Sequence, residues 1–292
     1  MKKPIRIISK LESKGLNLIK GINFDGHRVM GQTHLFAKKY FEEGIDELIY
    51  LDTVASLYDR PVLDNNIKKA CQNFFIPSSC GGGVKSIKKI ENLLKSGADK
   101  VLINSYATYN PNFISEASKI FGSQCISVGI DAFLRDDIYE VWTDYGRERT
   151  KLNLIDWVKK VQDLGAGEII LSSINYDGTG KGFDMRLIEA VIHNISTPLV
   201  FGGGCGNIKD VLILINNFPQ ISGISISTAF HYNYYESIYN PKYYSGYDNM
   251  NINFDIGNTE FINNNLVYPE ITEGFSIKEL KEKLKQNSIG IR

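Results

Sequence analysis

The stretch IPSSCGGG, residues 76–83, returns as TPLVFGGG at residues 197–204, 121 positions later. In both copies a proline, three further residues and three consecutive glycines follow one another. A second pair keeps the same offset, with GIDELIYL at 44–51 and GAGEIILS at 165–172. Repetition at a fixed period indicates an architecture built from similar units. The sequence therefore predicts two similar halves.

Short apolar or β-branched runs alternate with helical patterns along the chain. The runs expected as strands are 5–11, 47–51, 75–79, 100–104, 125–131, 168–172, 198–202 and 223–227. The patterns expected as helices are 34–43, 65–74, 86–95, 111–121, 154–164, 185–192, 208–218 and 277–286. Such alternation predicts a parallel sheet, and eight units suit a closed (β/α)8 TIM barrel of class α/β, a single domain over residues 1–292. A doubly wound open sheet is disfavoured because no GxGxxG motif follows the first strand.

The composition is typical of a globular protein that binds neither nucleic acid nor a membrane. Of the 292 residues, 43% are hydrophobic and 23% are charged, and 33 Lys and Arg balance 33 Asp and Glu. There is no basic excess for nucleic acid and no run of the ~20 apolar residues that span a membrane, so we expect a cytoplasmic protein. The four cysteines form no CxxC pair and the four histidines lack zinc-ligand spacing, which predicts neither a metal nor a cofactor.

Two carboxylates occupy matching positions in the two halves. Glu12 ends the run IISKLE (7–12), and Asp131 ends the run ISVGID (126–131), 119 positions later. In a closed eight-stranded barrel the first and fifth strands face each other across the mouth, where such barrels carry their chemistry. Glu12 and Asp131 are therefore candidates for a catalytic acid/base couple. The alternative is that a polar residue simply ends each strand.

Two glycine runs predict phosphate-binding sites on opposite sides of the mouth. Glycines let the backbone approach a ligand and offer N–H groups to an anion, and a helix N-terminus follows each run. The first cradle is expected to comprise Gly82, Gly83, Asn104 and Ser105. The second cradle is expected to comprise Gly203, Gly204, Ser227 and Thr228, with Asp177, Gly178 and Thr179 from a glycine-rich loop. A substrate with a phosphate at each end would bridge them; the alternative is that these glycines mark only tight turns.

Several motifs together resemble one known family. GIDELIYLD, SGADKVLIN, FGSQC, GAGEIILSSINYDGT and FGGGCGN are similar, in order, to signatures of the cyclase subunit of imidazole glycerol phosphate synthase, the HisF family. The likeness covers about residues 6–231 and 275–292. It implies a barrel of two similar halves, a bis-phosphorylated substrate, and ammonia delivered by a separate HisH-like glutaminase in a heterodimer. This chain has no Cys-His-Glu glutaminase arrangement of its own.

The resemblance also implies roles for particular residues. The family's catalytic residues are aspartates at the ends of the first and fifth strands; Asp131 matches one, whereas Glu12 stands in place of the other. Asp52 matches a mouth residue, and Asp99 matches a position that contacts the glutaminase. A ring of four charges that gates the ammonia passage is matched by Arg6, Glu47, Lys100 and Glu168.

A second reading comes from relatives of the same family. The stretches GLNLIKGINFDGHRVMG (15–31) and LDTVASLYDR (51–60) look more like HisF-like paralogues that accompany a sugar amidotransferase in surface-glycan synthesis. That likeness implies a barrel that conducts ammonia for amidation of a sugar, giving an acetamidino sugar, with little cyclase activity. A sugar-phosphate isomerase of the sister barrel family is disfavoured by the four-charge ring.

Two segments are expected as loops at the mouth. Residues 232–274 follow the eighth strand and hold seven tyrosines between Tyr232 and Tyr247, followed by many asparagines. Tyrosine-rich surfaces suit contacts with proteins or sugars, so this insertion is expected to dock a partner or cover the mouth; the alternative is an elaboration without a direct role. INFDGHRVMGQT, residues 22–33, is expected to be a lid loop after the first strand.

Overall fold

The computed structural model describes residues 4–53, 75–239 and 274–292, and within them a closed barrel is present. Its eight parallel strands are, in chain order, β1 (Arg6–Lys14), β4 (Glu47–Asp52), β5 (Ser78–Gly81), β6 (Lys100–Ile103), β7 (Ile126–Arg135), β10 (Glu168–Ser173), β11 (Leu199–Gly202) and β12 (Gly223–Ser225). Each strand pairs with the next one in this order, including β7 with β10. The last strand, β12, pairs with β1, so the sheet closes on itself. The predicted (β/α)8 barrel is confirmed.

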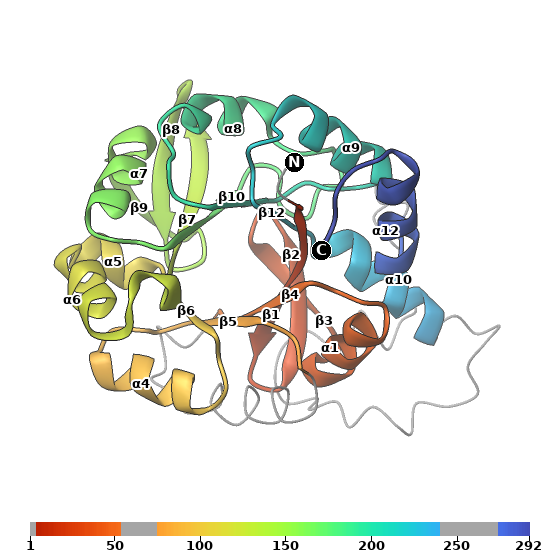
Figure 1. The fold of residues 1–292 in the computed structure, drawn as a ribbon, viewed down its shortest axis with the longest axis horizontal. Coiled ribbons are helices and arrows are strands. Elements are labelled where there is room, and N and C mark those ends of the chain that lie inside the picture. The colour runs from red at the N-terminus through yellow and green to blue at the C-terminus, as the bar shows by residue number, and fades with distance from the viewer. Residues whose placement is uncertain (1–3, 54–74, 240–273) are drawn as a thin grey trace.

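Helices surround the barrel on its outer side (Figure 1). They are α1 (Thr33–Glu42), α4 (Ile87–Lys95), α5 (Ser105–Tyr109), α6 (Asn112–Phe121), α7 (Leu154–Asp163), α8 (Met185–Ile192), α9 (Ile208–Asn217), α10 (Thr228–Tyr239) and α12 (Ile277–Gln286). Side-chain caps fix where several of them begin: Ser276 starts α12 and Asn207 starts α9, each in a capping box. The helix expected at 65–74 lies outside the described residues. In the described ranges, no helix is both long and apolar enough to cross a membrane.

The strands bury both faces, as parallel strands under a helical layer must. Outward side chains such as Ile7 pack against the helices in the main core. Inward side chains form a separate apolar layer within the barrel, contributed by Ile8, Ile49, Leu102, Ile170 and Val200. Because successive residues of a strand point to opposite faces, the layer at Ile8 places Arg6, Lys10 and Glu12 on the inward face of β1 as well.

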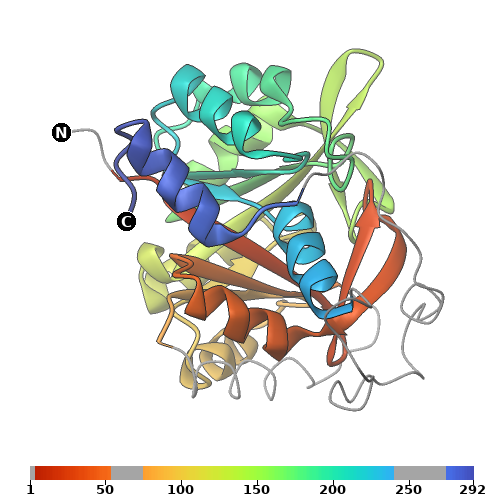
Figure 2. The ribbon, with the colours of Figure 1, turned by 90° about the vertical axis from the view of Figure 1, so that its right-hand side faces the viewer.

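Residues 22–33, expected as a loop, instead form most of a β-hairpin, so the loop expected there is wrong. β2 (Asn17–Ile22) and β3 (Asp25–Gln32) pair antiparallel, and β2 folds back along the end of β1. Asn23 and Phe24 make the turn with φ of 53° and 62°, the left-handed conformation of a tight hairpin turn. The sequence analysis did not predict a second hairpin, β8 (Ile138–Thr143) with β9 (Glu148–Asn153), which follows β7 and folds back so that β8 pairs antiparallel with it. Figure 2 shows both hairpins on the side of the barrel opposite the chain ends.

The start of the expected insertion is helical. Residues 232–239 belong to α10, and the rings of Tyr232 and Tyr235 are buried in the core rather than presented to a partner. The expectation that a loop begins at Tyr232 is therefore wrong for residues 232–239. Residues 240–273 lie outside the described residues.

Candidate active site at the barrel mouth

Four charged side chains close the floor of the barrel. Arg6 donates to Glu47 and to Glu168, at 2.5 Å in each case. Lys100 Nζ lies 3.1 Å from Glu47 Oε1 and 2.9 Å from Glu168 Oε2, which completes a ring of alternating charge. The hydroxyl of Ser79 also donates to Glu47, at 2.9 Å. Each carboxylate is thus balanced by two cations, as burial of charge requires.

Above this ring and the apolar layer, Asp131 lies at the mouth end of the barrel. It lies in the middle of β7, which continues past it to Arg135, and is 7% exposed. The Asn104 amide donates to its Oδ2 at 2.7 Å. Burial raises the pKa of Asp131 to about 6, against the lowering effects of Lys10 and of the Asn104 hydrogen bond. A carboxyl group with this pKa can both accept and donate a proton near neutral pH.

Glu12 is in a different state, because it is completely buried between two lysines. Lys10 Nζ lies 2.8 Å from its Oε1 and Lys20 Nζ lies 3.0 Å from its Oε2. Lys20 also pairs with Asp177 at 2.5 Å. Burial alone would raise the pKa of Glu12, but the two ammonium groups hold it well below its usual range. Glu12 therefore stays ionised and is a poor proton donor.

Aromatic side chains from both hairpins meet over these charges. The rings of Phe24 and Tyr145 stack with 4.5 Å between centroids, and His27 packs edge-on against Tyr145. Lys10 Nζ lies 4.9 Å from the centroid of Phe24. Phe24 and Tyr145 both have positive φ, a costly conformation for bulky residues that is sustained only where the surroundings enforce it.

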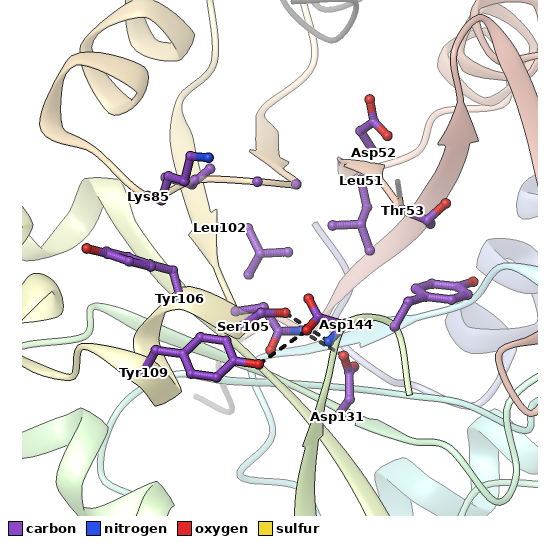
Figure 3. A pocket seen from close by; sticks show the side chains of 15 residues that line it. Leu51, Asp52, Thr53, Lys85, Leu102, Ser105, Tyr106, Tyr109, Asp131 and Asp144 are labelled. Atoms are coloured by element: carbon purple, nitrogen blue, oxygen red, sulfur yellow. Dashed lines mark hydrogen bonds between the residues drawn. The ribbon is translucent and has the colours of Figure 1, made fainter. Parts of the chain in front are cut away.

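The first cradle opens into a cavity of about 270 Å³ beside Asp131. The predicted residues that line it are Asp52, Gly82, Gly83, Asn104, Ser105 and Asp131 (Figure 3). Ser105 accepts a hydrogen bond from the backbone of Asp144, so the second hairpin also reaches this cavity. Gly82 has φ of +111°, and a Cβ there would lie 2.4 Å from the carbonyl oxygen of Asp52. That position therefore requires glycine.

The second cradle is much narrower. Its cavity, about 10 Å³, has room for about one water molecule. The predicted residues that line it are Asp177, Gly203, Gly204, Ser227 and Thr228. Gly178 and Thr179 do not line it; the Thr179 hydroxyl donates to the carbonyl of Tyr176.

Asp99 is exposed at the floor, next to Lys100, where its carboxylate accepts from the backbone of Ser78. Among the described residues no group of three or more His, Cys, Asp or Glu could hold a metal ion.

The sequence analysis missed three residues of the site, namely Lys10, Lys20 and Tyr145. Lys10 carried a signal, since its spacing from Arg6 and Glu12 places it on their face of the strand. Lys20 and Tyr145 carried none, because they reach the mouth through the unpredicted turns and pairings of the two hairpins.

Comparison with known proteins agrees with this arrangement. A family model described as "Histidine biosynthesis protein" matches residues 11–236. The imidazole glycerol phosphate synthase subunit HisF of Legionella pneumophila is 45% identical over 207 residues, 70% of this chain and 98% of the relative. The HisF subunits of Lactococcus lactis subsp. cremoris (40% over 229 residues, 78% and 88%) and of Petrotoga mobilis (38% over 233 residues, 79% and 91%) are similar too. The chain therefore belongs to the family of imidazole glycerol phosphate synthase HisF subunits.

Proposed function

We propose that this chain is the synthase subunit of a glutamine amidotransferase. It takes ammonia from a separate HisH-like glutaminase and uses it in cyclase and lyase chemistry of the imidazole glycerol phosphate synthase type, on a bis-phosphorylated substrate. One observation carries the proposal: Asp131, a buried carboxyl group with a pKa of about 6, lines the large cavity into which the first cradle opens.

The floor supports the ammonia route. The glutaminase would dock there, beside Asp99, and the ring of Arg6, Glu47, Lys100 and Glu168 would gate entry. Above the ring, the apolar layer around Ile8 disfavours charged ammonium and admits only a neutral molecule. Ammonia that passes this layer reaches the level of Lys10, Glu12 and Asp131.

At the mouth, Asp131 moves the protons. Ammonia adds to the imine carbon of the substrate, and protonated Asp131 gives its proton to the imine nitrogen. The new ammonium centre then returns a proton to Asp131. Glu12 is the other candidate for the acid/base couple, but its pairing with Lys10 and Lys20 suits a positioning role, as the counter-ion of two buried ammonium groups.

A second candidate function is favoured by that same pairing. If Asp131 acts without a partner base, cyclase turnover is weak, and the barrel serves chiefly to conduct ammonia to a sugar amidotransferase in surface-glycan synthesis. In that case Asp131→Asn would leave ammonia transfer largely intact, because no bond is made or broken at Asp131.

The test is an ammonia-driven assay. The purified chain, an ammonium salt and the phosphoribulosyl formimino substrate are followed for formation of imidazole glycerol phosphate. Turnover that is lost in Asp131→Asn supports the cyclase. No turnover from folded protein that still activates a HisH-like glutaminase supports the second candidate, and failure of both measurements rejects both functions.

A further inference from the structure

Lys10 is a buried ammonium that pairs with Glu12 and that the proposed proton transfers do not use. Its side chain is 7% exposed, and its Nζ pairs with Glu12 Oε1 at 2.8 Å. An ammonium group has three donors; in the part of the chain that the structure describes, Glu12 is the carboxylate that it pairs with, and the face of Phe24 covers another side. The group keeps hydrogen-bonding capacity beyond that pair.

The position of Lys10 directs that capacity into the second cradle. Lys10 lines the narrow cavity together with Gly203, Gly204, Ser227 and Thr228. Thr228 is the first residue of α10, whose unpaired first-turn N–H groups favour an anion. Asp177, the carboxylate in the same lining, is neutralised by Lys20 at 2.5 Å. The donors around this cavity therefore favour a negatively charged ligand.

The other half of the barrel lacks this cation. The offset of 119 that relates Glu12 to Asp131 relates Lys10 to Gly129. A Cβ at Gly129 would lie 3.3 Å from Asn104, which occupies the space beside it. The two cradles thus differ. The first cradle is wide and has the Asn104 amide beside Gly129, whereas the second cradle is narrow and has the Lys10 ammonium.

We propose that Lys10 is the cation of the second cradle and that this cradle binds the compact terminal phosphate group of the substrate. The ammonium group rotates on its flexible stem from Glu12 toward the entering phosphate, which also widens the cavity. The bulkier half of the substrate then lies in the cavity of about 270 Å³. This inference rests on the proposed function for the identity of the substrate, because it assigns one phosphate of that substrate to one cradle.

The experiment is a titration of the full chain with inorganic phosphate, followed by the amide signals of Gly203 and Gly204 in 1H–15N spectra. In Lys10→Met, the dissociation constant reported by these two amides should rise about tenfold or more, because a charge-assisted hydrogen bond is lost. The signals of Gly82 and Gly83 should report the same affinity as in wild type. Lys14→Met, a matched control at the end of the same strand, should change neither.

Two further variants keep the test decisive if Lys10→Met does not fold. Lys10→Arg retains the charge and should retain binding. Glu12→Gln frees the ammonium and should tighten binding at Gly203 and Gly204. Unchanged or tighter binding in Lys10→Met, or wild-type amides of the second cradle that do not respond to phosphate, would overturn the proposal. None of these readouts needs turnover or a glutaminase, so their failure leaves the proposed function standing.

Discussion

The ammonium of Lys10 lies 2.8 Å from Oε1 of Glu12, two residues further along the same strand. Both side chains point into the barrel, where neither can be left alone. A charge buried without its partner is far more costly than the pair. The relationship therefore turns a candidate catalytic carboxylate into part of the support of the mouth.

Glu12→Gln should lower the free energy of unfolding by about 3–5 kcal/mol, because two buried lysines lose their shared counter-ion. Chemical denaturation measures the loss. Adding Lys10→Met should recover part of it, with a coupling of about 1–3 kcal/mol in a double-mutant cycle. A Glu12→Gln variant as stable as wild type would show that the ion pairs are not maintained in solution.

Asp131→Asn should stabilise the protein at neutral and higher pH. The folded-state pKa of Asp131, about 6, exceeds its ordinary value of 3.8, so above pH 6 the folded protein carries a charge that burial penalises. The gain should be about 2–3 kcal/mol at pH 8 and should vanish as the pH falls below about 3, where the carboxyl group is protonated in both states. Thermal unfolding across this range measures it.

The exposed Asp136 provides the control for that prediction, since Asp136→Asn should give the same stability as wild type at every pH. An Asp131→Asn variant that is less stable than wild type at pH 8, or whose advantage is independent of pH, would mean that the carboxyl group is not desolvated.

Glu47→Gln should open the floor ring. Glu47 is 1% exposed and pairs with Arg6 and Lys100, so its loss should cost about 3 kcal/mol in the free energy of unfolding. Glu91→Gln on α4 is the matched control, because Glu91 pairs with Lys88 and Lys95 at the exposed surface, and its stability should equal that of wild type within error. If the ring gates ammonia, Glu47→Gln should also lower glutamine-driven turnover more than ammonia-driven turnover.

Gly82→Ala should destabilise the barrel by at least about 2 kcal/mol more than Gly26→Ala. Both glycines have positive φ, so both variants carry the backbone cost. At Gly82 the added Cβ would lie 2.4 Å from a backbone oxygen, whereas at Gly26 it meets nothing within 4 Å. Equal losses in a denaturant titration would mean that the strand ends move apart and that the first cradle is not rigid.

Local signals in the sequence predict the barrel well. The helix expected at 277–286 is α12 residue for residue, because Ser276 and Glu279 form its capping box. The repeated glycine runs predict residues that line both cavities. Gly82 and Gly203 each have a positive φ, which glycine adopts most readily.

The ion pairs at the barrel mouth could not be predicted from the sequence. Glu12 and Lys20 are eight residues apart, and they meet only because β2 folds back along β1 in one particular register. The pairing of Lys20 with Asp177 depends on the closure of the whole barrel. Nothing local in the chain distinguishes the ionised Glu12 from the protonatable Asp131, although they stand at matching positions.

The aromatic cluster of the two hairpins has an optical consequence. The chain contains two tryptophans. Trp142 packs 5.0 Å from Phe133 in the cluster that also holds Phe24, Tyr145 and Ile174, whereas Trp157 is buried on α7. Replacing Trp157 with phenylalanine leaves Trp142 as the single tryptophan, placed where the hairpins meet. Its emission would then record, in real time and without a label, each separation of the two turns as a ligand enters.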